Sequence, residues 1–308
     1  KIFQIGKANR AKYILVGKEG FDAAKKRISK SRKILKNKNL SESDVLEKIK
    51  KETGFFLDIF ENVTAVLDYA FTEILNNAIE HSQADRCAIR VILGQSLVSF
   101  EIRDHGIGVF HSIASKLKLS DEEAALIELI KGRTTTMPEA HTGEGIFFTS
   151  RIGDDFVLKS HRVQIEWKRA KQDMFVSQPR LSAGTLVQFS LQRSARQTIE
   201  EVFSEFAPEQ YDFQFQKTRV LVKLLQPDYV SRSEARRLLA NLEKFREIFL
   251  DFRDVRSVGQ GFADEVFRVF ASRNPGIVIR SENTSPPVTA MIRHVGPTPS
   301  DSAPTDRS

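Results

Sequence analysis

One short stretch of the chain carries the polar side chains best placed to form a site. It reads Phe-Thr-Glu-Ile-Leu-Asn-Asn-Ala-Ile-Glu-His-Ser from Phe71 to Ser82. At about 100° per residue, a helix here has one apolar face and one face rich in carboxylate, carboxamide and imidazole groups. The apolar face holds Leu67, Phe71, Ile74, Leu75, Ala78 and Ile79, and the polar face holds Glu73, Asn76, Asn77, Glu80 and His81. An ordinary amphipathic surface helix explains this periodicity equally well, so the functional interpretation depends on the segments that follow.

A second candidate group is the sequence Asp104-His-Gly-Ile-Gly108, which follows a predicted strand. Glycines at alternate positions, Gly106 and Gly108, let the backbone approach a flat ligand closely. The carboxylate of Asp104 is then free to accept hydrogen bonds from that ligand. A strand that ends in an Asp-Gly turn is common, so this pattern is informative only together with its neighbours in the sequence.

A third candidate element is the polar loop from Gly132 to Ile146, which contains Thr142, Gly143 and Gly145. Glycines at the start of a helix, preceded by threonines, expose backbone N–H groups and the positive helix end to an anion such as phosphate. The loop is also long enough to act as a lid.

The surrounding pattern predicts the elements that position these groups. Residues 87–93 and 97–103 are expected to form a hairpin of strands, because β-branched and alternating apolar residues dominate them. Helices are expected from about residue 21 to 62, at 111–119 and at 121–131, and further strands at 155–160, 162–168 and 185–191, the last opened by Gly184 and Thr185. Ser41 or Ser43 is a suitable N-cap for the helix that starts near Asp44.

The length and composition of the chain limit the classes of protein to which it can belong. With 308 residues, 41% of them hydrophobic, the chain suits two domains with real cores. The single cysteine, Cys87, allows neither an internal disulfide nor a cysteine cluster for a metal, which favours a cytoplasmic location. We find no apolar run near the roughly 18 residues of a membrane span and no signal peptide, and therefore expect a protein without a membrane partner.

The positive charge of the chain is concentrated at its N-terminal end. Residues 1–51 contain 16 Lys and Arg against 5 Asp and Glu, although the whole chain has a net charge of only +7. Such a segment can attract nucleic acid or an acidic protein surface, and a solvated helix face is the simpler alternative. The stretch from Gly6 to Leu15 could be the last strand of a winged-helix domain.

Taken in order, these pieces resemble the GHKL superfamily, which includes gyrase, the large heat-shock chaperone, mismatch-repair MutL, and the histidine and anti-sigma serine kinases. The resemblance covers about residues 60–192. It rests on Glu-x-x-x-Asn in a helix, Asp-x-Gly-x-Gly after a strand, a Gly-x-Gly lid and a Gly-Thr that opens a strand. It implies an α/β sandwich of the α+β two-layer type that holds ATP between helices and a mixed sheet.

The resemblance also implies roles for the matching residues. Asn77 would ligate Mg²⁺ between the phosphates, and Glu73 would be the general base toward water or a substrate hydroxyl. Asp104 would accept a hydrogen bond from the adenine amino group. The other nucleotide contacts would come from Asn76, His81, Gly106, Gly108, Thr142, Gly143, Gly145 and Thr185.

Two features depart from the commonest GHKL pattern. The lid contains Glu144 where many relatives have a Gly-Leu-Gly-Leu type sequence, which adds a negative charge beside the expected phosphates. In addition, none of the six histidines lies in a Ser-His-Glu type dimerisation helix. A self-phosphorylating histidine kinase is therefore disfavoured.

Beyond residue 192 the pattern changes. Residues 193–215 are expected to form a connector, residues 216–295 a smaller α/β domain of alternating strands and helices, and residues 296–308 a disordered tail. The run from Phe249 to Asp264 resembles the strand, loop and helix of STAS domains, the antagonist modules of sigma-factor partner switching. The resemblance makes Ser257 a candidate phosphoacceptor, although Arg256 replaces the usual preceding aspartate; a plain helix N-terminal turn is the alternative.

The sequence thus predicts an intracellular ATP-binding signalling regulator with a GHKL domain, a STAS-like domain and a basic N-terminal segment. In one version Mg·ATP supports protein serine kinase or ATPase activity. In the other, ATP is a structural ligand or dimerisation switch that controls DNA or protein binding. The expected partners are ATP, a partner protein, a second copy of the chain and, through the basic segment, nucleic acid.

Overall fold

The computed structural model describes residues 2–5, 12–15, 30–53, 59–94, 96–132, 144–208, 216–224 and 229–295. The chain divides into two compact units, Lys1–Ser204 and Glu205–Ser308. The division falls within the segment 193–215 that the sequence predicts as a connector. Thr142, Gly143 and the tail 296–308 lie outside the described residues.

The first unit is built on a seven-stranded sheet in the order β3-β4-β5-β9-β6-β7-β8. Its strands are β3 (Lys30–Lys36), β4 (Arg86–Leu93), β5 (Leu97–Asp104), β6 (Asp155–Ser160), β7 (Val163–Lys168), β8 (Asp173–Ser177) and β9 (Thr185–Gln192). Every neighbouring pair in this sheet is antiparallel. The expectation of a mixed sheet is therefore wrong, and the described architecture is a large antiparallel sheet with helices.

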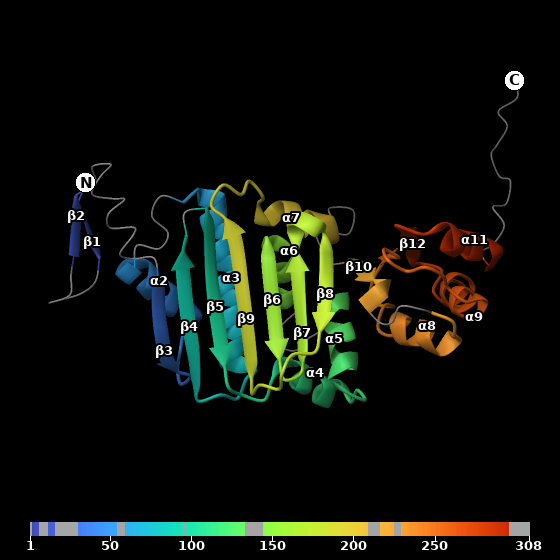
Figure 1. The fold of residues 1–308 in the computed structure, drawn as a ribbon, viewed down its shortest axis with the longest axis horizontal. Helices are drawn as coiled ribbons and strands as arrows, with labels where there is room; N and C mark the ends of the chain where they lie inside the picture. Colours follow the sequence, from blue (N-terminus) through green and yellow to red (C-terminus); the bar gives the residue numbers. More distant parts are fainter. Residues whose placement is uncertain are drawn as a thin grey trace, which may run out of the picture. The chain divides into compact units, whose positions relative to one another are not determined.

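Helices gather on one face of this sheet, behind it in the view of Figure 1. The unit contains α2 (Glu42–Thr53), α3 (Glu61–Glu80), α4 (Val109–Leu117), α5 (Glu122–Lys131), α6 (Gly145–Ile152) and α7 (Ile199–Phe206, which crosses the unit boundary). The long helix α3 packs against β5, β9, α2 and α6. It therefore lies where its polar side chains can meet the loops between strands and helices.

Aromatic rings join α3 to the centre of the sheet. The rings of Phe71 and Phe100 meet edge to face at 5.3 Å, and Phe100 stacks on Phe189 of β9 at 5.2 Å. Such pairs add to the stabilisation from burial alone. The predicted apolar face of α3 is confirmed for Leu67, Phe71, Ile74, Leu75 and Ala78, which are all buried.

Two strands differ from the sequence predictions. Residues 30–36 form β3 rather than part of a helix, with alternate residues exposed. Edge strands commonly carry lysines on their open side. In β3 the charged residues obscure the alternation of apolar and polar residues by which a strand is recognised in a sequence. Strand β8 was not predicted. The predicted hairpin of β4 and β5 and the helices near 111–119 and 121–131 are confirmed within a few residues.

The second unit contains a three-stranded parallel sheet in the order β10-β11-β12. Strands β10 (Lys217–Leu221), β11 (Glu247–Asp251) and β12 (Val278–Glu282) alternate with α8 (Arg232–Leu239) and a helical segment made of α9 (Gln260–Asp264), a π-helical stretch (Glu265–Phe270) and α10 (Ala271–Arg273). Helix α11 (Pro286–Val295) follows. The alternation predicted for a small α/β domain is confirmed, and α11 is an addition.

Near the start of the chain, β1 (Ile2–Ile5) and β2 (Lys12–Leu15) form an antiparallel pair, with Ile2 opposite Leu15. The proposed final strand of a winged-helix domain thus coincides in part with β2. A pair of strands on its own does not define a winged helix, so this assignment stays a prediction.

Candidate functional site

Asp104 is the last residue of β5, and the residue as a whole is 3% exposed. Its Oδ1 accepts hydrogen bonds from the backbone N–H groups of Gly106 at 2.9 Å and Thr185 at 3.2 Å. Burial raises the pKa of Asp104, and the two N–H donors only partly oppose this effect. Among the described residues, Oδ2 accepts no further hydrogen bond. One carboxylate oxygen therefore holds the loop together and the other is left for a ligand.

Gly106 places the loop after Asp104 directly against the end of α3. A Cβ atom at this position would overlap the backbone carbonyl of Ser82. The N–H of the next residue, Ile107, donates to that same carbonyl at 2.9 Å. The absence of a side chain at Gly106 is thus a requirement of the packing, and the loop is fixed to the helix that carries Glu73 and Asn77.

The start of β9 contacts the other side of the loop formed by residues 104–108. The hydroxyl of Thr185 accepts a hydrogen bond from the N–H of Val109 at 3.1 Å, which ties β9 to the first residue of α4. Gly108 has a φ of +82° and Gly184 a φ of +71°, values that favour glycine. A Cβ at Gly184 would also overlap the Asp104 carbonyl. The structure therefore brings Asp104, Gly106, Gly108 and Thr185 together, although they come from two distant stretches of chain.

Glu73 lies earlier in α3 than the part of the helix near Ser82, at the point where α3 contacts the start of α6. A Cβ on Gly145 would overlap the carboxylate oxygen Oε2 of Glu73. Burial raises the pKa of Tyr69, and the negative charges of Glu73 and Glu144 raise it further, so this phenol also lies beside both carboxylates. The first turn of α6 and the polar face of α3 are thus in direct contact.

Asn77 lies one turn after Glu73 and is half-buried. Its amide Nδ2 donates to the backbone carbonyl of Glu73 at 2.7 Å. This bond occupies the nitrogen of the amide and leaves its oxygen for another partner. An amide oxygen is a ligand that Mg²⁺ accepts, usually with only one or two protein ligands besides phosphate and water.

The predicted site residues thus lie along the C-terminal half of α3 and just beyond its end. Glu73 and Ser82 are nine residues apart, about 13 Å along a helix axis, with Gly145 beside the first and Gly106 beside the second. Asn76 is half-buried, and His81 is the C-cap of the helix, where its backbone N–H donates to Asn77 O at 3.1 Å. Thr142 and Gly143 lie outside the described residues.

Three residues around the site were not predicted from the sequence. Tyr69 lies beside Glu73, and Ser82 receives the glycine loop. The Nδ1 of His161, in the turn between β6 and β7, is hydrogen-bonded to Glu122 Oε1 at 2.5 Å, and a Cβ at Gly108 would lie 2.8 Å from Nε2 of the same ring. The period of α3 could have indicated Tyr69, which lies one turn before Glu73. Only the tertiary fold brings His161 to Gly108.

Aromatic packing holds α6 in place over Glu73. Phe148 of α6 stacks on Phe203 of α7 with ring centroids 4.1 Å apart, and Phe203 meets Tyr69 edge to face at 5.7 Å. The start of α6 is therefore anchored to α3 through α7, and Gly145 keeps its place beside the carboxylate.

In the second unit, Ser257 is exposed in the loop between β11 and α9. It lies two residues before the N-cap of α9, Gly259. The position leaves the hydroxyl accessible. Nothing in the local geometry distinguishes a phosphoacceptor from an ordinary loop residue.

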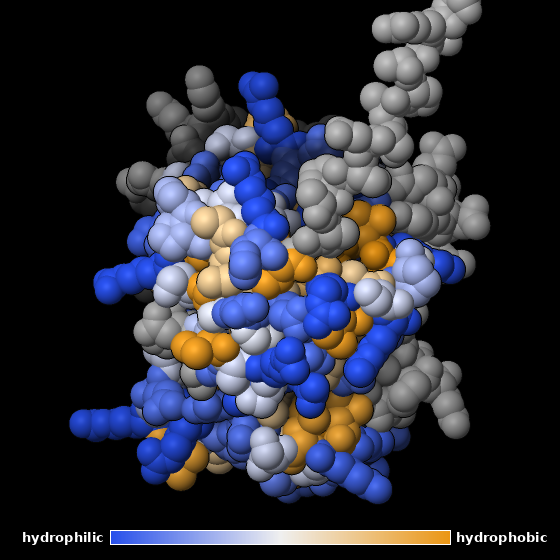
Figure 2. Space-filling view, turned by 90° about the vertical axis from the view of Figure 1, so that its right-hand side faces the viewer, coloured by the Kyte–Doolittle hydropathy of each residue, from blue (hydrophilic) through white to orange (hydrophobic). Residues whose placement is uncertain are grey.

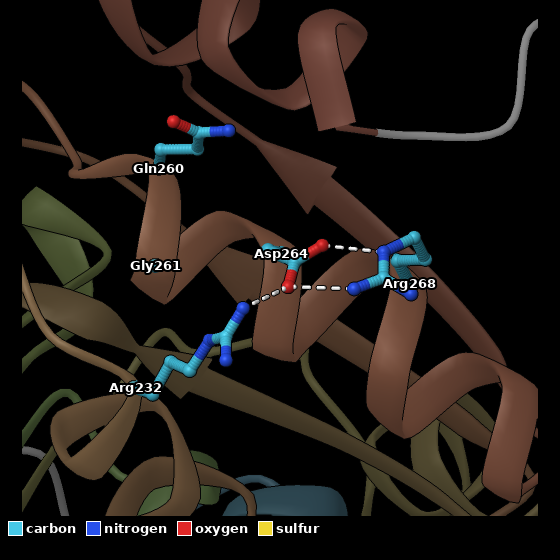
Figure 3. A pocket seen from close by; sticks show the side chains of 5 residues that line it. All are labelled: Arg232, Gln260, Gly261, Asp264 and Arg268. Carbon is cyan, nitrogen blue, oxygen red and sulfur yellow. Dashed lines mark hydrogen bonds and ion pairs between the residues drawn. The ribbon is translucent and has the colours of Figure 1, made fainter.

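A shallow pocket of about 540 Å³ lies beside that loop, lined by Arg232, Gln260, Gly261, Asp264 and Arg268 (Figure 3). The carboxylate of Asp264 accepts hydrogen bonds from Arg232 of α8 and from Arg268, and these bonds lower its pKa. Arg236 pairs in the same way with Glu265 at 2.9 Å. The ion pairs Arg232–Asp264 and Arg236–Glu265 both join α8 to the helical segment that follows β11. This structural role is enough to explain why these charged residues are present.

The hydropathy of the surface, the length of the helices and the grouping of acidic, His and Cys side chains bear on which partners the chain can bind. On the face toward the viewer in Figure 2, hydrophobic residues form small separate areas among hydrophilic ones. No helix within the described ranges is long and apolar enough to cross a membrane. In the same part of the chain, no group of three or more His, Cys, Asp or Glu side chains could hold a metal ion.

Comparison with known proteins gives one match, in the second unit. No curated protein matches the chain. Residues 234–289, from α8 to α11, match the family described as a STAS-like domain of unknown function (DUF4325). The match does not reach the first unit, so any function of the site around α3 must be argued from its own geometry. The C-terminal part of the chain contains a STAS-like domain.

Proposed function

We propose that the first unit is a GHKL-type domain that binds ATP along the polar face of α3. The observation that carries this proposal is the arrangement of two glycine-containing segments along the C-terminal half of one helix. Gly106 contacts α3 at Ser82, and Gly145 contacts it at Glu73. The distance between these points, about 13 Å along the axis, suits an extended nucleoside triphosphate.

The end near Ser82 supports the recognition of a base. Asp104 is buried, is held by the N–H groups of Gly106 and Thr185, and keeps its Oδ2 for a ligand. A carboxylate oxygen can accept a hydrogen bond from a donor on a ligand, and the adenine amino group is such a donor. Gly106 and Gly108 carry no side chain that would keep a flat base away from this carboxylate.

The end near Glu73 supports the binding of phosphates. The first turn of α6 presents backbone N–H groups there, because its N-cap residue, Glu144, makes no side-chain cap. Mg²⁺, when bound, would neutralise phosphate charge, and Asn77 would hold it through the free amide oxygen. Glu73 is near enough to this position to take a proton from water or from a protein hydroxyl.

The test is incubation of the full chain with ATP labelled at the γ-phosphate. Label transferred to a protein indicates a kinase, released labelled phosphate indicates an ATPase, and tight binding without either indicates a nucleotide-gated switch. We expect Asn77→Ala to abolish Mg²⁺-dependent transfer or release, whereas Asn62→Ala, on the same helix, should leave it unchanged. Undiminished turnover in Asn77→Ala would refute the metal assignment.

A nucleotide-gated switch without catalysis is the second candidate. The observation that favours it is Glu144, which places a negative charge at the start of α6 and close to Tyr69 and Glu73. Repulsion between this carboxylate and a phosphate would weaken the phosphate end of the site. In both versions the STAS-like domain is the candidate for the module that contacts a partner protein.

A further inference from the structure

The face of the seven-stranded sheet that the helices leave open carries a cluster of positive charges at its β3 end. Figure 1 shows this face toward the viewer, with no described helix over β3, β4 or β5. Because side chains alternate along a strand, the residues between the buried ones point to this face. We call the cluster formed by Arg32, Lys36, Arg86, Arg90 and Arg103 the basic face.

The register of the strands brings these cations close together. Arg32 lies directly opposite Arg90, and Lys36 directly opposite Arg86. All four side chains are exposed. Like charges directly opposite each other in adjacent strands destabilise a sheet. These pairs therefore cost the fold stability, and packing does not require them.

Acidic residues offset little of the charge of the basic face. On the open side of β3, β4 and β5, the single acidic residue is Glu101, which lies opposite Arg90 and accepts a hydrogen bond from Gln188 at 2.9 Å. Within the described part of the chain, none of the five cations forms a salt bridge. By contrast, Lys33, which points to the other side of β3, pairs with Glu52 of α2.

The size of the basic face fits the backbone of a nucleic acid duplex. The two opposed pairs are four residues apart along β3, about 13 Å, and Arg103 lies between them on β5, opposite Ala88. A duplex carries one phosphate charge per about 1.7 Å of axis, so several phosphates fall within this length. The charges are spread over three neighbouring strands, so they can reach several phosphates.

Other partners fit less well. Strands β3, β4 and β5 have no aromatic residue on their open side. Single-stranded nucleic acid is usually held by stacking of its bases on aromatic rings, and the hot spots of protein interfaces are enriched in Trp, Tyr and Arg, of which this face offers only Arg. The basic N-terminal segment, residues 1–51, also includes β3, so part of the charge surplus noted in the sequence lies on this face.

We propose that the basic face binds the phosphate backbone of double-stranded nucleic acid without sequence specificity. This role is independent of the nucleotide site. Binding releases counterions from the duplex, so the affinity must fall steeply with salt. Arg86 and Arg90 each contribute one phosphate contact, and their removal lowers both the affinity and its salt dependence.

The experiment is a fluorescence anisotropy titration of the full chain with a labelled, mixed-sequence DNA duplex at several salt concentrations. Arg86→Thr with Arg90→Thr removes two charges from the basic face, and Arg162→Thr with Arg180→Thr removes two exposed charges elsewhere in the same unit. Relative to this control, the first variant should bind about tenfold more weakly for each lost contact near 0.1 M salt. The slope of log affinity against log salt should become less negative by about 1.8.

Thermal unfolding shows whether the first variant is folded. Because it removes two like-charge oppositions, its melting temperature should equal or exceed that of the wild type. Equal affinities and salt slopes for the two variants would overturn the proposal. So would binding of polyglutamate in place of the duplex, since that result would identify an acidic protein as the partner.

Discussion

At the scale of single residues, Asp104 connects the structure to the proposed function most closely. Its aspartate type and its place at a strand end could be predicted from the sequence. Its burial and the donation of Thr185 N–H to its Oδ1 could not, because Thr185 is 81 residues away in the chain. The same holds for Glu73 and Gly145: spacing predicts each element, but only tertiary packing puts their atoms in contact.

The burial of Asp104 predicts a pH dependence of stability. Its raised pKa means that the folded chain holds a proton more tightly than the unfolded chain does. Stability should therefore fall as pH rises from the ordinary aspartate pKa of about 3.9 through the raised value. Asp104→Asn should remove this loss. The melting temperature of the variant should therefore rise relative to that of the wild type as the pH increases over this range. The exposed control Asp85→Asn should show no such gain; a constant difference between Asp104→Asn and the wild type at every pH would contradict the account.

At the scale of elements, the strongly periodic helix α3 and the β4–β5 hairpin are predictable, and β3 is not. A run of alternating apolar and polar residues identifies β5, whereas β3 carries charges on both sides. The charges toward the helices are paired, as in Lys33 with Glu52, and those on the open side are not. Only the positions of β4 and α2 in the folded structure reveal which charges of β3 are paired and which are not.

The contact between α3 and α6 gives a prediction for Gly145. Gly145→Ala places a methyl group where the Glu73 carboxylate now lies. The side chain of Glu73 can rotate away, and alanine favours a helix more than glycine does, so the melting temperature should not fall. Turnover of ATP should fall, because the proposed base is displaced. Gly276→Ala, in the second unit, serves as the control, and full turnover in Gly145→Ala would argue against Glu73 as the base.

The start of α8 gives a stability prediction in the STAS-like unit. The Ser231 hydroxyl accepts from the Glu234 N–H, and the Glu234 carboxylate accepts from the Ser231 N–H, which forms a capping box. The Ser-x-x-Glu spacing is the sequence signature of such a box. Ser231→Ala should lower the free energy of unfolding by about 1 kcal/mol, measured by urea denaturation. Ser257→Ala, which removes an exposed hydroxyl, should leave it unchanged within error; equal losses in both variants would contradict the capping role.

At the scale of the whole molecule, the chain combines an antiparallel sheet unit with a STAS-like unit that has a parallel sheet. Alternating strands and helices made the second unit predictable, since a parallel sheet needs a crossover after each strand. The strand order of the first unit was not predictable, because β9 inserts between β5 and β6 although it follows both in the chain. That insertion brings Thr185 to Asp104, and with it completes the proposed adenine end of the site.

The most direct measurement of the central claim is a calorimetric titration of the full chain with ATP, with and without Mg²⁺, for the wild type and for Asp104→Asn. The asparagine retains an oxygen for the Gly106 and Thr185 N–H groups, so the fold should persist. It also places an amide donor against the adenine amino group. We predict that the wild type binds ATP, that Mg²⁺ strengthens this binding, and that folded Asp104→Asn binds at least tenfold more weakly. No binding by the wild type, or equal binding by both proteins, would contradict an ATP site on α3.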